Sequence, residues 1–473
     1  ACTHTSASTT ADLKQRSAAL LAAIRPYRAW IGAATLVAIV IIGPVAAIPG
    51  ARLFPLWLWV AAAPVVAITA VDLIRGGRLN IVIAGLILIA GLVVVIVLSG
   101  LRAGRLLAVL GLPGGAALPG LAAIVIAGVV GMVLAIVEGF RPSGRAVLLG
   151  TAVGSMVFVD VGLILLGIDR NNALLDLRIY LAAGERFVTG LPAYQFTPLQ
   201  AVPSEVAEYP FLYPPPFLPI AAALSQLPLM VVGSASIVAS TVACVAALRL
   251  VGVRWLWVPI LLLWPPFIEA IWVGNVVVYG LLILALAVWR PRRAGVLVAG
   301  PLFKPQFAIP ALWLVRGRRW RPLFEGLLVV GIVVLVTLPL LGIGAWVDWI
   351  RGLLAWQTSV QTMPILNSFA LARDLPYGAF LVLAGAAVVW GLLPRGLAGL
   401  RRLGVASVVA SPSLYRHGLL EMIPAMVVLD FDVLLVVVGS TVSRLGFWAG
   451  VLIVIVAFSL APERIADEPL PSV

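Results

Sequence analysis

The sequence has few charged residues, two cysteines and two histidines. Only 11% of its 473 residues are Asp, Glu, Lys or Arg, whereas an ordinary soluble domain carries about 25%. A soluble globular protein is therefore excluded. Cys2, Cys244, His4 and His417 are too scattered for a disulfide framework or a His/Cys metal site. No glycine-rich phosphate loop is present either, so we expect neither a metal ion nor a cofactor.

Apolar residues take the place of the missing charge. They make up 62% of the chain, and the mean hydropathy is +1.14. Apolar runs of about 20 residues recur along most of the chain, which is the length a helix needs to cross a bilayer. We therefore expect an all-α, polytopic membrane protein with roughly 12–15 membrane segments, some of them broken or re-entrant.

The formal net charge of +13 is explained by the basic residues that set the orientation of a membrane protein. Lys14 and Lys304 are the only lysines, and the arginines lie in short loops between apolar runs. That pattern is typical of cytoplasmic loops, so we expect no nucleic-acid partner. We expect the protein in the cytoplasmic membrane, crossing it many times, with its N-terminus inside the cell.

The apolar runs divide the chain into four parts. Residues 1–28 are polar and form a cytoplasmic tail, and residues 29–145 hold additional N-terminal transmembrane helices. Residues 146–430 form the core, whose long polar segment 168–212 is an outer loop. Residues 431–473 hold the last membrane segment or segments and a tail. Long polar loops between membrane segments usually carry function.

Several later runs contain breaks. The run 256–289 is too long for one straight helix, and we interpret it as one broken helix. Basic residues flank 294–315 on both sides, so this segment is expected to turn back within the membrane near Lys304. A span over 323–341 would lead to a second outer loop, 342–376. Non-helical backbone at membrane depth is tolerated only beside protein or a water-filled cavity.

Four polar signatures fall on the outer face or on these breaks. They are the Asp176 loop, Lys304–Pro305, Asn367–Phe369 with Arg373, and Ser411–His417. Together with Gly190–Tyr194, Tyr213–Phe217 and Gly274–Asn275, their order and spacing resemble the actinobacterial polyprenol-phosphate-mannose-dependent α-mannosyltransferases of the phosphatidylinositol mannoside and lipomannan type. These enzymes belong to the C-type glycosyltransferase superfamily. The resemblance covers about residues 146–430.

The resemblance implies an inverting mannosyl transfer, with α-1,2 as one candidate linkage, at the outer face of the membrane during cell-envelope glycolipid synthesis. The donor would be polyprenyl-phosphate mannose and the acceptor a lipid-anchored glycan. Asp176 would be the general base, because an acceptor hydroxyl loses its proton as it attacks. A simple alternative is that Asp176 caps its helix, and Asp160 and Asp169 are other candidates for the base.

Three cationic or titratable residues are expected near the leaving phosphate. Lys304 and Arg373 would bind the phosphate of the donor, and His417 is the second catalytic candidate. Each has a plainer alternative: Lys304 pairs with an acid such as Glu269 or extends to the interface, Arg373 is an ordinary loop residue, and His417 bonds Ser411 in the core. We expect the acceptor or the sugar to contact the remaining candidates, which are Arg178, Tyr180, Tyr213, Asn275 and Asn367.

Two rival functions stay open at this stage. The same chemistry with another sugar, such as arabinofuranose, uses the same kind of site. A transporter of lipids or glycans without chemistry also explains many spans and an intramembrane lysine. A transporter predicts two related halves with matching broken helices, and the sequence contains no such repeat that is apparent by eye.

Overall fold

The computed structural model describes residues 148–149, 152–153, 156, 160, 173–197, 209–362, 369–394, 396–442 and 444–460. These described residues form helices and no strand, which confirms the all-α prediction. The spans expected over 29–145 lie outside the described residues, as do Asp169, Asn367 and part of the outer loop.

The chain divides into two compact units. The first takes its described residues from 148–156 and Asp430–Gly450, and the second from 160–429 and 451–460. In the first unit, Asp430 caps helix α20 (Phe431–Gly439), because its carboxylate accepts a hydrogen bond from the backbone nitrogen of Asp432 at 3.1 Å. Every described residue expected at the functional site belongs to the second unit.

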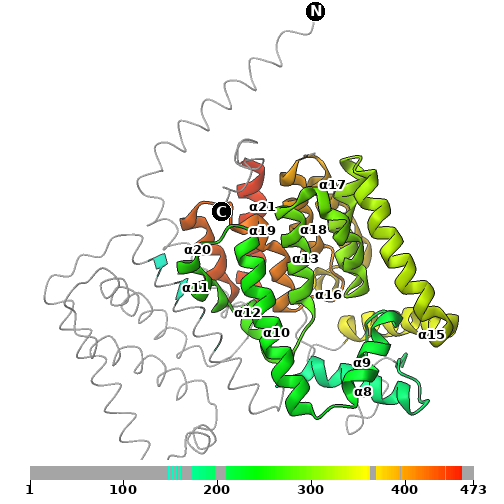
Figure 1. Ribbon diagram of the computed structural model, residues 1–473. Coiled ribbons are helices and arrows are strands. Elements are labelled where there is room, and N and C mark those ends of the chain that lie inside the picture. The colour runs from blue at the N-terminus through cyan, green and yellow to red at the C-terminus, as the bar shows by residue number, and fades with distance from the viewer. Residues whose placement is uncertain are drawn as a thin grey trace, which may run out of the picture. The chain divides into compact units, whose positions relative to one another are not determined.

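The second unit is a bundle of helices of very different length (Figure 1). In chain order they are α8 (Leu175–Val188), η3 (Pro215–Phe217), α9 (Leu218–Ser225), α10 (Leu229–Leu250), η4 (Trp255–Trp257), α11 (Val258–Leu262), α12 (Pro265–Val273), α13 (Val277–Trp289), η5 (Pro291–Leu302), η6 (Pro305–Phe307), α14 (Ala308–Arg316), α15 (Trp320–Thr362), α16 (Leu371–Asp374), α17 (Tyr377–Leu392), α18 (Leu397–Val409), η8 (Arg416–Met422) and α19 (Ile423–Met426).

Two described helices are long and apolar enough to cross a membrane, Leu229–Leu250 and Trp320–Val360. A third span results if the bent pair Trp255–Leu262 and Pro265–Val273, which meet at 67°, counts as one. Shorter apolar helices accompany them, so the chain is a polytopic helical membrane protein. The run 256–289 is broken, as expected, and its breaks lie before Pro265 and at Gly274–Asn275.

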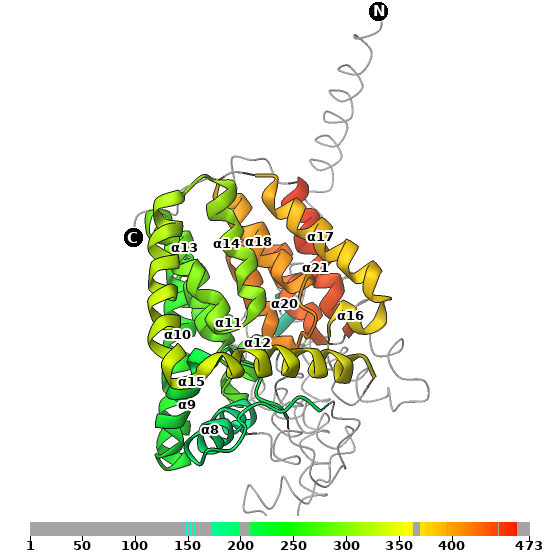
Figure 2. The same ribbon diagram turned by 90° about the vertical axis from the view of Figure 1, so that its right-hand side faces the viewer.

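Helix α15 corrects the expected outer loop 342–376. Residues up to Thr362 are helical, and Gly342 (φ 69°, ψ 167°) separates a membrane-length arm from a second arm. Glycine reaches that backbone conformation at little cost. In Figure 2 the helix descends along one side of the unit and then turns to cross its lower part. The indole of Trp349 in the second arm donates a hydrogen bond to the backbone oxygen of Leu212 at 3.0 Å.

The segment 291–316 turns back on itself as expected. η5 leads to an extended Lys304 (φ −148°, ψ 139°), and η6 and α14 lead away from it. A Cβ placed on Gly295 would lie 2.3 Å from the backbone oxygen of Pro322. The start of η5 therefore lies beside the start of α15, and the basic residues that flank the hairpin share one end of the unit.

Candidate active site

Helix α8 presents Asp176 at its first turn. The helix begins at Leu175, and no side chain caps its N-terminus. Asp176 lies inside the helix, so the alternative in which its side chain caps the helix is wrong. Its carboxylate instead accepts a hydrogen bond from Nδ2 of Asn275. The backbone nitrogen of Leu174 donates to the oxygen of Trp272 at 2.8 Å, which ties the start of α8 to the end of α12.

Gly274 makes this approach possible. It ends α12 in the left-handed conformation (φ 71°, ψ 37°), which glycine adopts readily. A Cβ at this position would lie 2.9 Å from Cβ of Leu177. Next to it, Asn275 is buried, and its Oδ1 accepts from the backbone nitrogen of Val277 at 2.9 Å. That bond leaves the amide nitrogen for Asp176.

An aromatic cluster also packs against α8. The hydroxyl of Tyr180 donates to the hydroxyl of Tyr213 at 2.6 Å, and the hydroxyl of Tyr194 donates to the backbone oxygen of Tyr213 at 2.9 Å. The Tyr180 and Tyr213 rings meet edge to face, with 4.7 Å between their centroids. Both tyrosines are buried in the core. The cluster fixes the orientation of α8, and a contact of either residue with sugar stays a prediction.

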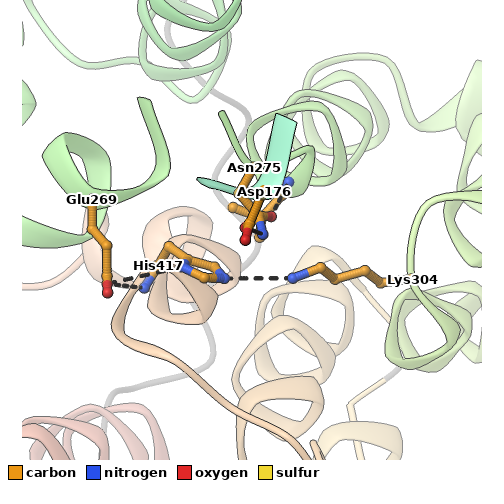
Figure 3. A network of polar contacts seen from close by, with 6 residues as sticks. Asp176, Glu269, Asn275, Lys304 and His417 are labelled. Atoms are coloured by element: carbon orange, nitrogen blue, oxygen red, sulfur yellow. Dashed lines mark hydrogen bonds and ion pairs between the residues drawn. The ribbon is translucent and has the colours of Figure 1, made fainter. Parts of the chain in front are cut away.

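Lys304 and His417 meet across the site. Nζ of Lys304 lies 3.5 Å from Nε2 of His417. On the other side of His417, Oε2 of Glu269 accepts from the backbone nitrogen at 3.0 Å and lies 3.8 Å from Nδ1. Figure 3 shows this row of three side chains, with Asp176 and Asn275 next to it. The site thus combines α8, α12 with the residues after it, the tip of the hairpin and η8.

The electrostatics of the site favour a carboxylate that works as a base. Burial raises the pKa of Asp176 above its ordinary value, while the hydrogen bond from Asn275 and the charge of Lys304 act in the opposite direction. The net shift is upward. A carboxylate with a raised pKa binds a proton more strongly, which improves its efficiency as a general base near neutral pH.

Two of the plainer alternatives, a direct pair of Lys304 with Glu269 and a bond of His417 to Ser411, are not what the structure contains. Glu269 lies on the far side of His417, so it does not pair directly with Lys304. The hydroxyl of Ser411 donates to the backbone oxygen of Ser413 at 2.9 Å, and no hydrogen bond links it to His417 among the described contacts. Tyr415 stacks on the His417 ring, with 5.8 Å between centroids and planes 16° apart.

Other expected residues lie at the margins. Arg178 follows Asp176 on α8 and is half-buried, as is Arg373 on α16. Arg186, in the last turn of α8, donates to the backbone oxygen of Ala193 at 3.4 Å. Asp160, the alternative base, is buried, and neither of its carboxylate oxygens has a hydrogen-bond partner among the described residues.

Two acids near the site, Glu269 and Glu421, were given no catalytic or binding role from the sequence, where Glu269 was expected only as an alternative partner of Lys304. Glu269 stands in an apolar run, where an acid is costly and therefore a functional signal. Glu421 is buried and accepts a hydrogen bond from the hydroxyl of Ser407. Glu421 also stands in an apolar stretch, five residues after Arg416, so the sequence marks it as a candidate functional residue for the same reason as Glu269.

Comparison with known proteins finds a family match in the middle of the chain. Residues 211–414 match the model of glycosyltransferase family 87. The match includes Glu269, Asn275, Lys304 and Arg373, while His417 lies shortly after it and Asp176 lies well before it. Neither the curated proteins nor the solved structures gave a match. Together with the apolar helices, the family match indicates a membrane glycosyltransferase.

Proposed function

We propose that the protein transfers mannose from polyprenyl-phosphate mannose to a lipid-anchored glycan at the outer face of the cytoplasmic membrane. One observation carries the proposal. A carboxylate with a raised pKa, Asp176, and an ammonium group, Lys304, share one site although they come from distant parts of the sequence. Base and phosphate-binding cation are the two groups that this reaction needs from a protein.

In the proposed reaction Asp176 accepts the proton of an acceptor hydroxyl as the oxygen attacks C1 of mannose. The bond from C1 to the phosphate oxygen breaks, and its electron pair leaves with the lipid phosphate. The configuration at C1 inverts. Because phosphate is already a good leaving group, the paired acid that hydrolases use is not needed. Lys304, with Arg373 at the margin, would stabilise the negative charge of the phosphate.

The position of the site supports a donor carried by lipid. Helix α8 is amphipathic, as expected of a helix at a membrane interface. The arginines at the other end of the unit would face the cytoplasm, which turns the Asp176 end outward. Outside the cell, nucleotide sugars are absent and lipid phosphates can carry the sugar. Arg178 would bind an acceptor phosphate, and Asn367 stays an expected sugar contact.

Arabinofuranose transfer is the second candidate, since it uses the same base and the same leaving group. A transporter is a poorer explanation, because it gives no reason for a carboxylate with a raised pKa beside a cation, nor for a glycosyltransferase family match.

A labelling experiment separates these functions. Membranes that contain the protein are incubated with polyprenyl phosphate carrying either labelled mannose or labelled arabinofuranose. We expect label in glycolipid from the mannose donor, and none in matched membranes without the protein. Transfer from the arabinofuranose donor alone would replace the sugar in the proposal. Translocation of the lipid without transfer would overturn it.

A further inference from the structure

We propose that Glu269 and His417 are positioning residues that hold Lys304 toward the phosphate of the donor. The proposal rests on the proposed function and explains how Lys304, the phosphate-binding group in that function, is oriented. The three side chains form a row in which His417 stands between an acid and a cation (Figure 3). Glu269 lies on α12, Lys304 at the tip of the hairpin and His417 on η8.

The contacts of Lys304 determine where the proton of His417 lies. A lysine ammonium has three donors and no acceptor. Nε2 of His417, 3.5 Å from Nζ, must therefore be the acceptor, and a neutral imidazole then carries its proton on Nδ1. A doubly protonated ring would bring two cations into contact in a buried site, which is unfavourable.

The negative charge of Glu269 favours this tautomer, at a distance from Nδ1 that is longer than a hydrogen bond. Its Oε2 lies 3.8 Å from Nδ1, and the same oxygen accepts from the backbone nitrogen of His417 at 3.0 Å. A carboxylate beside the second ring nitrogen sets the tautomer and the orientation of a histidine in many functional sites. Tyr415 stacks on the ring and limits its rotation. The row as a whole combines one anion, one neutral ring and one cation, so its charge is balanced.

Other charges surround the row. The fields of Asp176, Glu421 and Glu269 act on Lys304, and those of Lys304 and Arg416 act on His417. Both cations oppose a second proton on the ring. In this arrangement His417 has no proton on the nitrogen that faces the cation, so it cannot supply one to the leaving phosphate. His417 accepts a hydrogen bond from one N–H group of Lys304, and the other two N–H groups can donate to phosphate oxygens.

Replacing His417 in two ways tests this role. Glutamine has an amide oxygen about where Nε2 lies and can accept from Lys304, but it cannot act as an acid. Leucine removes the acceptor. We expect His417→Leu to raise the apparent KM for the donor about tenfold or more, and His417→Gln to recover most of that loss. The KM for the acceptor and the pH profile should stay close to those of the wild type.

Glu269→Gln should raise the KM for the donor by a smaller factor, about three- to tenfold. In the double variant with His417→Leu it should add nothing, because Glu269 acts through His417. Glu325→Gln is the matched control, since Glu325 is exposed and pairs with Arg321 at 2.8 Å outside the site. Equal losses in His417→Gln and His417→Leu, or additive losses in the double variant, would overturn the proposal.

A binding measurement separates this proposal from the proposed function. Purified protein and variants are titrated with a short-chain polyprenyl phosphate that carries no sugar. The affinity for the phosphate could fall from wild type to His417→Gln to His417→Leu while no sugar is transferred. That result would support the positioning role of Glu269 and His417 and contradict mannosyl transfer. If mannose is transferred but the two variants at position 417 bind the phosphate equally, the row fails alone.

Discussion

The second unit has charges at two ends, and they are held in different ways. At the basic end, Arg316 donates to the backbone oxygen of Leu392 at 2.8 Å, and the guanidinium of Arg319 lies 4.0 Å from the centroid of the Trp313 ring. Arg321 pairs with its helix neighbour Glu325, and both are exposed. At the other end, Asp176, Lys304 and His417 contact side chains from distant parts of the chain.

The difference separates charges that orient the chain from charges that act together. An exposed arginine with a local partner contributes little to stability, roughly 0–1 kcal/mol, and its neighbours can replace it in setting the topology. Charges in the site are desolvated and coupled, so removal of one changes the others. Substitutions at the two ends should therefore differ sharply in effect.

Asp176→Asn should produce the largest loss. It keeps the size of the side chain and the contact with Asn275 but removes the base, so kcat should fall by about 100- to 10,000-fold. Single-turnover transfer of labelled mannose measures this. Glu185→Gln is the control, because Glu185 is an exposed acid on the same helix. An Asp176→Asn protein with the turnover of the control would remove Asp176 from the reaction.

Lys304→Met should come next. It preserves the length of the side chain and removes the charge, so the apparent KM for the donor should rise roughly ten- to hundredfold. The KM for the acceptor should barely change. Arg321→Met at the basic end should leave both constants within about twofold, since the residue is exposed. If Lys304→Met lowers thermal stability and leaves donor kinetics intact, the phosphate is bound elsewhere, and Arg373 is the first residue to test.

The acid limb of the pH profile should report Asp176. Only the unprotonated carboxylate can accept a proton, and burial raises its pKa. Activity should therefore fall as pH drops through a range above that of an ordinary Asp, by about tenfold for each unit below the pKa. Because the charge of Lys304 lowers this pKa, the acid limb should move to higher pH in Lys304→Met. A shift to lower pH would contradict the assignment.

Gly274→Ala should give the smallest change of this series. Alanine at φ 71° costs roughly 1–2 kcal/mol, and its Cβ would press on Leu177. The start of α8 should move away from Asn275, with a loss of kcat of about tenfold or less. Thermal unfolding shows whether stability falls as well. Gly331→Ala is the control, because a Cβ there would meet no atom within 4 Å.

The sequence predicted those parts of the site that interrupt apolar runs. Gly274–Asn275 and Lys304 stand out against hydrophobic surroundings, whereas Asp176 was predicted from its place in the long polar segment 168–212, and the structure brings all of them to one place. The sequence did not predict contacts between residues that are far apart in the chain, such as Glu269 with His417. No local sequence pattern indicates such contacts. We expected the second arm of α15 to be a loop, since its polar residues are typical of a segment outside the membrane. Its helix is instead stabilised by contacts such as that of Trp349 with Leu212.

Opposite sidedness of the two ends is the central claim, because a lipid-phosphate donor follows from an outward-facing site. In a protein whose Cys2 and Cys244 are replaced by alanine, Thr197→Cys and Arg321→Cys place single thiols at exposed positions of the two ends. We predict that an impermeant thiol reagent labels Thr197→Cys in intact cells and Arg321→Cys only after lysis. The reverse pattern would put Asp176 in the cytoplasm, where nucleotide sugars are present, and would contradict the account.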